Sequence, residues 1–188
     1  MPPGFDPVGG SFAALAEFVW KKLIGILTHP AGGAGIVADL GSGYSVEDDE
    51  ALKRAKIVNF ARSQQGKPYK FGIEIDPDKA ADAVAWDCSE FTSVAYQSAA
   101  SLTLPDGCVY QQAFCQKVNT QKPADLIFLG PNKNGIRHVL MLTGDGTVIH
   151  AKGGVGVIEE DASSWLAHIR FEGVYRHPEF SRGQEDRI

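Results

Sequence analysis

Apolar residues recur at two different spacings along the chain, one in each half. In the first half they repeat at helical spacing, which predicts helices over residues 11–27, over residues 48–65 and from Asp87 to a turn at 104–107. In the second half, short apolar runs are separated by turn residues. These runs predict strands at Leu126–Leu129, His138–Thr143, Thr147–Lys152 and Arg170–Arg176. Helices followed by antiparallel strands are typical of an α+β domain.

The same pattern divides the chain into three parts. Residues 1–45 contain the first predicted helix and a glycine-rich linker, residues 46–180 the α+β domain, and residues 181–188 a polar tail. The helix over 11–27 is apolar on more than one side, whereas a surface helix buries a single stripe. It therefore either packs on its own domain or docks to another copy or a partner. A membrane surface is less favoured, because only two lysines mark its polar side.

Composition and charge exclude several classes of protein. The 188 residues include 18 Lys and Arg against 23 Asp and Glu, and this net charge of −5 argues against a nucleic-acid partner. Three cysteines are too few, and an odd number, for a disulfide scaffold. The longest apolar stretch is interrupted by charged residues at Glu17, Lys21 and Lys22, so no membrane-spanning helix is predicted. The first ten residues carry no positive charge, and we expect no secretory signal.

Cys88 is the first candidate for chemistry. It follows Asp87, which is placed to cap the third predicted helix, and Glu90 at the third helical position completes the pattern of a capping box. A thiol in the first turn of a helix lies at the positive end of the helix dipole, which lowers its pKa. The alternative for Cys88 is a buried structural cysteine. Cys108 and Cys115 have no comparable setting and are interpreted as structural.

His138 and His150 are the candidate bases, on the two strands of a predicted hairpin. If a three-residue loop pairs Thr143 with Thr147, both imidazoles project from one face as diagonal neighbours. A two-residue Asp145-Gly146 turn would place them on opposite faces. Cooperation between the histidines therefore requires the odd-length loop.

Metal binding is the rival use of these side chains. Cys88, His138 and His150 could supply three zinc ligands, but no paired Cys or His spacing supports this. The acidic residues of the segment after Gly72 lack the glycine and terminal glutamate of a calcium loop, and we expect a solvated loop there. They are Asp76, Asp78 and Asp82.

With these residues in place, the chain resembles the NlpC-type (NlpC/p-sixty) cell-wall peptidases, a family of papain-like cysteine enzymes. The matching pieces follow the family's order over about residues 50–176. They are Gly66–Gly72, Trp86–Ser89, Pro105 followed by Gln111, Ala124–Phe128, and His138-Val139 running to Ile149–Ala151.

The resemblance implies a papain-like α+β fold and a set of site residues. Cys88 would be the nucleophile, His138 the base, and His150 the third polar residue, which orients that base. Tyr69 would lie beside the nucleophile and help to hold the oxyanion or the substrate. Asp87 and Ser89, on either side of Cys88, complete this oxyanion- and substrate-binding set. No metal or cofactor is implied.

The chain departs from the usual family pattern at three positions. Glu90 stands where the family usually has glycine, Phe71 replaces a tryptophan, and Ala124 replaces a glycine. The Asp-Cys-Ser-Glu variant and the acidic insert over residues 74–85 resemble peptidase domains found in bacteriophage tail proteins.

By this resemblance we expect a cysteine endopeptidase that cuts an amide bond in the stem peptide of peptidoglycan. Two alternatives stay open: an amidase or acyltransferase using the same Cys–His pair, and a non-catalytic tail or assembly module that retains the fold. Without an export signal the protein would be made in the cytoplasm. It would then reach the cell wall as part of a virion or injection machine, with residues 11–27 contacting that partner.

Overall fold

The computed structural model describes residues 46–130, 135 and 137–181. The predicted helix over 11–27, its linker and all but the first residue of the predicted tail lie outside these residues. No helix within the described part is both long and apolar enough to cross a membrane.

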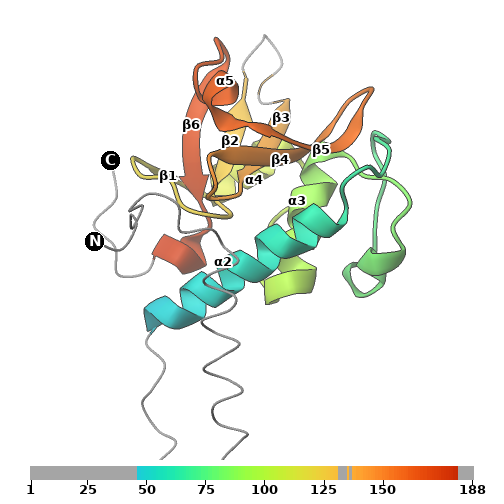
Figure 1. Ribbon diagram of the computed structural model, residues 1–188, viewed down its shortest axis with the longest axis horizontal. Coiled ribbons are helices and arrows are strands. Elements are labelled where there is room, and N and C mark those ends of the chain that lie inside the picture. Colours follow the sequence, from blue (N-terminus) through green and yellow to red (C-terminus); the bar gives the residue numbers. More distant parts are fainter. Residues whose placement is uncertain (1–45, 131–134, 136, 182–188) are drawn as a thin grey trace, which may run out of the picture. The chain divides into compact units, whose positions relative to one another are not determined.

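Helices come first and an antiparallel sheet follows (Figure 1). The longer helices are α2 (Val46–Ser63), α3 (Cys88–Ala100) and α4 (Cys108–Phe114), with a short 3-10 helix η1 (Pro77–Asp82) before α3. The strands are β1 (Gln116–Val118), β2 (Leu126–Leu129), β3 (His138–Leu142), β4 (Thr147–Lys152), β5 (Gly156–Asp161) and β6 (Phe171–Arg176). A short helix, α5 (Ala162–Leu166), lies between β5 and β6. A 3-10 turn η2 (Pro178–Ser181) follows β6. The sheet order is β1-β6-β2-β3-β4-β5, and the fold is α+β.

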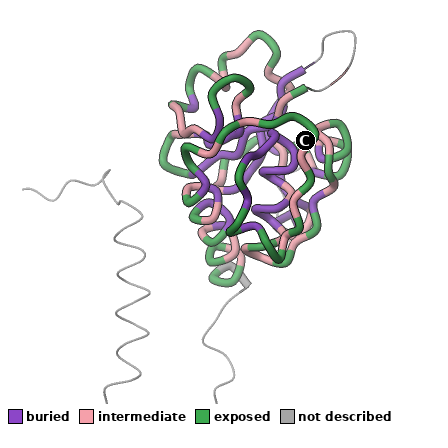
Figure 2. Tube along the Cα trace, turned by 90° about the vertical axis from the view of Figure 1, so that its right-hand side faces the viewer, coloured by how far each residue is buried: buried purple, intermediate pink, exposed green. Residues whose placement is uncertain are grey.

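Apolar side chains form a cluster on each face of this sheet. The buried residues lie in the interior of the trace (Figure 2). On one face α2 and α3 pack together, and α3 covers β3 and β4. Their buried side chains include Ile57, Val58, Phe91, Val94, Val139, Met141 and Ile149. On the other face α5 contacts β4 and β6 over a smaller cluster that includes Leu140 and Val148. Successive side chains along β3 and β4 therefore point alternately into the two apolar clusters on the opposite faces of the sheet.

The predicted elements of the domain are present with small shifts, and others were missed. The strands β2 and β4 have the predicted bounds, and β3 and β6 differ by one residue. The third helix is shorter than predicted, because Ser101 adopts a left-handed conformation (φ 55°) and ends it before the turn at 104–107. The sequence pattern did not indicate η1, α4, β1, β5, α5 or η2. The expected loop contains the 3-10 helix η1, which Asp76 caps, whereas the carboxylates of Asp76, Asp78 and Asp82 are exposed to solvent as expected.

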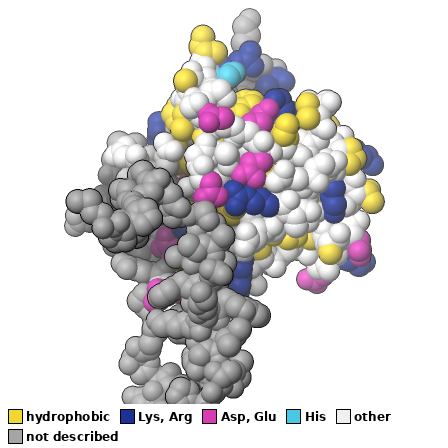
Figure 3. All heavy atoms as spheres, in the orientation of Figure 1, with side chains coloured by type: hydrophobic (Ala, Val, Ile, Leu, Met, Phe, Trp, Pro, Cys, Tyr) yellow, Lys and Arg dark blue, Asp and Glu magenta, His cyan; other side chains and the backbone are white. Residues whose placement is uncertain are grey.

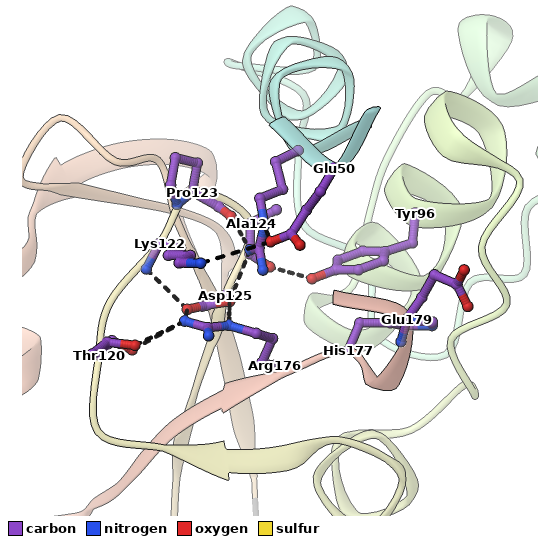
Figure 4. A network of polar contacts seen from close by, with 11 residues as sticks. Glu50, Tyr96, Thr120, Lys122, Pro123, Ala124, Asp125, Arg176, His177 and Glu179 are labelled. Atoms are coloured by element: carbon purple, nitrogen blue, oxygen red, sulfur yellow. Dashed lines mark hydrogen bonds and ion pairs between the residues drawn. The ribbon is translucent and has the colours of Figure 1, made fainter. Parts of the chain in front are cut away.

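A buried ion-pair network joins α2 to the sheet (Figure 4). Asp125 is fully buried and accepts hydrogen bonds from Arg176 Nε (3.0 Å) and Nη2 (2.8 Å), and from Arg54 Nη1 (2.9 Å). Arg54 also donates to the carbonyl of Pro123 at 2.6 Å. Next to Asp125, Ala124 has φ 62°, in the left-handed region that favours glycine. This conformation gives a physical reason for the glycine that the family pattern usually has at this position.

Candidate active site

Asp87 positions the start of α3. Its Oδ1 accepts a hydrogen bond from the backbone N–H of Glu90 (2.8 Å) and one from the hydroxyl of Ser89 (3.2 Å). Its Oδ2 accepts from the N–H of Gly72 (3.1 Å), which ties the preceding loop to the helix. Cys88 is thereby held as the first residue of α3, as the N-cap prediction requires.

The second half of the predicted capping box is wrong. The carboxylate of Glu90 accepts a hydrogen bond from the N–H of Ile75 at 2.5 Å, so it holds the loop before η1. Glu90 is buried, and burial raises the pKa of its carboxyl group.

The Cys88 thiol lies among groups that favour its thiolate. Its pKa falls to about 5, chiefly through a hydrogen bond from the Cys108 thiol and against the opposing effect of burial. A hydrogen bond from the His138 side chain, the charge of that imidazole and the backbone amide of Val139 lower the pKa further. These contacts favour the thiolate, the form in which a cysteine can act as a nucleophile.

Cys108, interpreted from the sequence as structural, has a setting comparable to that of Cys88 and contacts it. It is the first residue of α4, and its sulfur lies 3.5 Å from Cys88 Sγ. Its own pKa is raised, first by the hydrogen bond to Cys88 and then by burial, so we assign the S–H to Cys108 and the thiolate to Cys88. Sequence reasoning missed α4, a helix with a glycine N-cap and no side-chain cap. Cys115 is buried, and burial raises its pKa to about 12.

The hairpin has the register that lets the two histidines meet. Met141 pairs with Ile149 and Leu142 with Val148, as the three-residue loop predicts. His138 Nε2 and His150 Nδ1 are 2.6 Å apart. The predicted cooperation of the histidines is thus present in the geometry.

Glu160 extends this pair and was missed by sequence reasoning. Its Oε2 lies 3.1 Å from His150 Nε2, and its Oε1 accepts from Lys152 Nζ at 2.8 Å. Glu160 lies on β5, where Val148 is its direct partner and His150 its diagonal neighbour. The signal was the run Gly156–Asp161 after a glycine turn, which continues the hairpin as a third strand.

Trp165 on α5 lies against the rings of His138 and His150, and sequence reasoning also missed it. Its indole N–H donates to Glu160 Oε2 at 3.2 Å, and its ring lies 5.0 Å from the His150 ring and 6.4 Å from the His138 ring, between centroids. His150 is fully buried. Burial, followed by the charge of His138, lowers the His150 pKa to about 4, against the opposing effect of the hydrogen bond that His150 donates to Glu160.

The proton positions follow from these partners. A neutral His150 carries one N–H, and we assign it to Nε2, where Glu160 accepts it. His150 Nδ1 then accepts the N–H of His138 Nε2, which leaves His138 Nδ1 for the nucleophile.

Tyr69 lies in the loop between α2 and α3, beside the nucleophile. It forms a bridge with Trp86, supported by hydrogen bonds from Trp86 N to Pro68 O and from Lys70 N to Trp86 O, each 3.0 Å. Burial and then the negative charge of the Cys88 thiolate raise the pKa of Tyr69 to about 12. The hydroxyl therefore keeps its proton and is a donor at neutral pH.

A pocket of about 200 Å³ adjoins His138. It is lined by Leu129, Gly130, Arg137, His138, His168 and Arg170. On the face of the molecule seen in Figure 3, a histidine side chain lies close to Lys and Arg side chains near the upper end of the view. Among the described residues, no group of three or more His, Cys, Asp or Glu side chains could hold a metal ion.

The chain resembles known proteins in its sequence pattern and in its fold. The NlpC/P60 family profile matches residues 66–173, more than half of the chain, whereas no curated protein matches. The peptidoglycan hydrolase RipB from Mycobacterium tuberculosis superposes with a TM-score of 0.57 at 23% identity, covering 93% of this chain and 90% of RipB.

Two further solved structures agree with this fold. The NlpC/p60 domain of the peptidoglycan hydrolase SagA has a TM-score of 0.51 and 28% identity, covering 65% of this chain and 97% of that domain. An NlpC/P60 family protein from Bacillus cereus has a TM-score of 0.57 and 24% identity over 66% of this chain, which spans 40% of that protein. The chain belongs to the NlpC/P60 family and has that family's papain-like fold.

Proposed function

We propose that this chain is a cysteine peptidase that hydrolyses an amide bond in the stem peptide of peptidoglycan. The observation that carries the proposal is the chain of contacts from Cys88 through His138 and His150 to Glu160, at the start of α3. SagA, described as a peptidoglycan hydrolase, is 28% identical over the matched region and supports the substrate class. The basic lining beside His138 suits stem peptides, which carry free carboxylates.

In the proposed mechanism, the Cys88 thiolate attacks the amide carbonyl carbon. The backbone N–H of Cys88, at the start of α3, and the Tyr69 hydroxyl stabilise the oxyanion that develops. His138, protonated at Nδ1, gives that proton to the leaving amine and then removes a proton from the water that releases the acyl group.

His150 and Glu160 act on the orientation and charge of His138. A neutral His150 accepts the Nε2–H of His138 and donates its own N–H to the Glu160 carboxylate. The Glu160 carboxylate therefore stabilises the His138 imidazolium through His150. It supplies the negative charge that the neutral His150, as the third residue of the site, lacks. Asp87 and Ser89 hold the helix start, and their predicted contact with substrate stays part of this proposal.

Delivery by a virion or injection machine, with residues 11–27 as the contact, is the finer part of the proposal. It is supported by the apolar surface of that predicted helix and by the phage-like Asp-Cys-Ser-Glu pattern.

Digestion of purified peptidoglycan tests the proposal. We expect stem-peptide fragments, identified by mass, from the wild-type chain and none from Cys88→Ala, with an unchanged circular dichroism spectrum for the variant. The matched control is Cys115→Ala, which removes a buried thiol remote from the chemistry. Wall fragments from Cys88→Ala at the wild-type rate, or no fragments from the wild type, would contradict it.

A further inference from the structure

The Cys108 thiol has no step in the proposed hydrolysis, yet it touches the nucleophile. The two sulfurs are 3.5 Å apart, and a disulfide needs about 2.05 Å, so an approach of about 1.5 Å would join them. We propose that Cys88 and Cys108 form a reversible disulfide on exposure to a peroxide, which makes the pair an oxidation site. That the disulfide switches hydrolysis off rests on the proposed function; its formation does not.

The fold holds the two helix starts together. Gln111, one turn into α4 and fully buried, donates from Nε2 to the carbonyl of Ser89 at 2.9 Å. Its Oε1 accepts the hydroxyl of Thr92 at 2.9 Å. Because Cys88 and Cys108 begin these two helices, the clamp keeps their sulfurs in contact.

The two thiols differ in a way that sets the order of the reaction. The surroundings of Cys88 favour its thiolate, and only the thiolate attacks peroxide readily. Cys108 keeps its proton. Cys108 is partly exposed, whereas Cys88 is only 6% exposed. Cys88 is therefore the attacking sulfur and Cys108 the resolving one.

The steps balance with hydrogen peroxide as the oxidant. The Cys88 thiolate attacks one peroxide oxygen, so that an S–O bond forms, the O–O bond breaks and hydroxide leaves, giving a sulfenic acid. The Cys108 sulfur then attacks the Cys88 sulfur, the S–S bond forms, and the S–O bond breaks. The departing hydroxide takes the Cys108 proton and leaves as water. Overall one thiolate and one thiol lose two electrons, and one peroxide becomes one hydroxide and one water.

Cys115 is the control within the chain. It follows the last residue of α4, and a helix of this length puts it roughly 10 Å along the axis from Cys108. That separation is beyond the reach of a disulfide. Cys115 is also buried with a raised pKa, so it should stay reduced.

The experiment treats the full-length chain with hydrogen peroxide and maps its cysteines by mass spectrometry after alkylation. We expect a Cys88–Cys108 link, Cys115 free, and a mass lower by two hydrogen atoms. Dithiothreitol should restore the thiols and at least about nine-tenths of the untreated activity. Cys115→Ala should behave like the wild type.

Cys108→Ser removes the resolving sulfur. In this variant we expect Cys88 to proceed to sulfinic acid under the same treatment, so that dithiothreitol recovers several-fold less activity relative to its own untreated rate. Recovery equal to the wild type, Cys88 over-oxidised without a link in the wild type, or a link to Cys115 would overturn the proposal. The mapping needs no hydrolysis, so a failure of the proposed function would appear separately.

Discussion

At the scale of single residues, the site depends on which sulfur and which nitrogen carry a proton. Cys88 is buried, which by itself would keep its thiol neutral. The Cys108 thiol, the His138 imidazole and the Val139 amide outweigh burial, and the pKa falls to about 5. The result is a thiolate next to an imidazole that can hold the proton.

This pKa predicts the pH dependence of the nucleophile. Below pH 5 the thiolate gains a proton, so the alkylation rate of Cys88 by iodoacetamide should fall about tenfold per pH unit. Above pH 5 the rate should be nearly constant to neutral pH. Cys115, with a pKa of about 12, should stay unreactive throughout. A midpoint near that of an ordinary thiol, about 8.5, would contradict the assignment.

The two histidines should differ in importance. His138→Ala removes the proton donor and acceptor, which is worth roughly 10²–10⁴-fold in kcat. His150→Asn keeps a polar partner for His138 Nε2 and should retain measurable activity. Peptidoglycan digestion rates for both variants test this order. The opposite ranking would exchange the roles.

Glu160 should act on kcat without contacting substrate. Glu160→Ala removes the acceptor at His150 Nε2, and kcat should fall roughly tenfold, less than for loss of the base. Glu160→Gln keeps an acceptor oxygen and should recover part of the loss, with KM unchanged in both variants. The matched control is Glu159→Gln, whose carboxylate faces Arg62 and Thr147 instead. Equal losses at 159 and 160 would refute a role through His150.

At the scale of elements, the ion-pair network of Asp125 joins α2, β2 and β6. Asp125→Ala removes the buried carboxylate that Arg176 and Arg54 share in the core, which should cost about 3–5 kcal/mol of unfolding free energy. Asp49→Ala, which breaks the exposed pair with Lys53 on α2, should cost at most about 1 kcal/mol. Urea denaturation measures both. A similar small loss for the two variants would show that the network is not stabilising.

At the scale of the whole molecule, the two apolar clusters of the described residues and the candidate site residues all lie between residues 46 and 181. We therefore expect a fragment of residues 46–188 to fold and to digest peptidoglycan at a rate close to that of the full chain. If residues 1–45 dock to a partner, the fragment should also lose self-association or particle binding, measured by light scattering and co-sedimentation. An insoluble or unfolded fragment would show that the predicted helix over 11–27 belongs to the catalytic core.

The local pattern of the sequence was sufficient for the α+β class, for Asp87 as N-cap of the helix that Cys88 begins, and for a hairpin that carries His138 and His150. Each depends on neighbours in the sequence: a capping side chain precedes its helix, and loop length sets hairpin register. The pattern left the loop length of that hairpin open, and the structure decided for the three-residue loop. The roles of Cys88, His138 and His150 came from resemblance to a family, and their chemistry stays a prediction.

Only the tertiary structure decided the surroundings of these residues. Cys108 is twenty positions from Cys88 in the chain, and its contact depends on how α4 packs on α3 through Gln111. Glu160 reaches His150 because β5 pairs with β4, and Trp165 closes the pair from a helix on the far side of the sheet. Asp125 meets Arg54 and Arg176 across 71 and 51 positions. Periodicity reports which face of an element is buried, but not which distant element covers it, and that packing sets the protonation of the site.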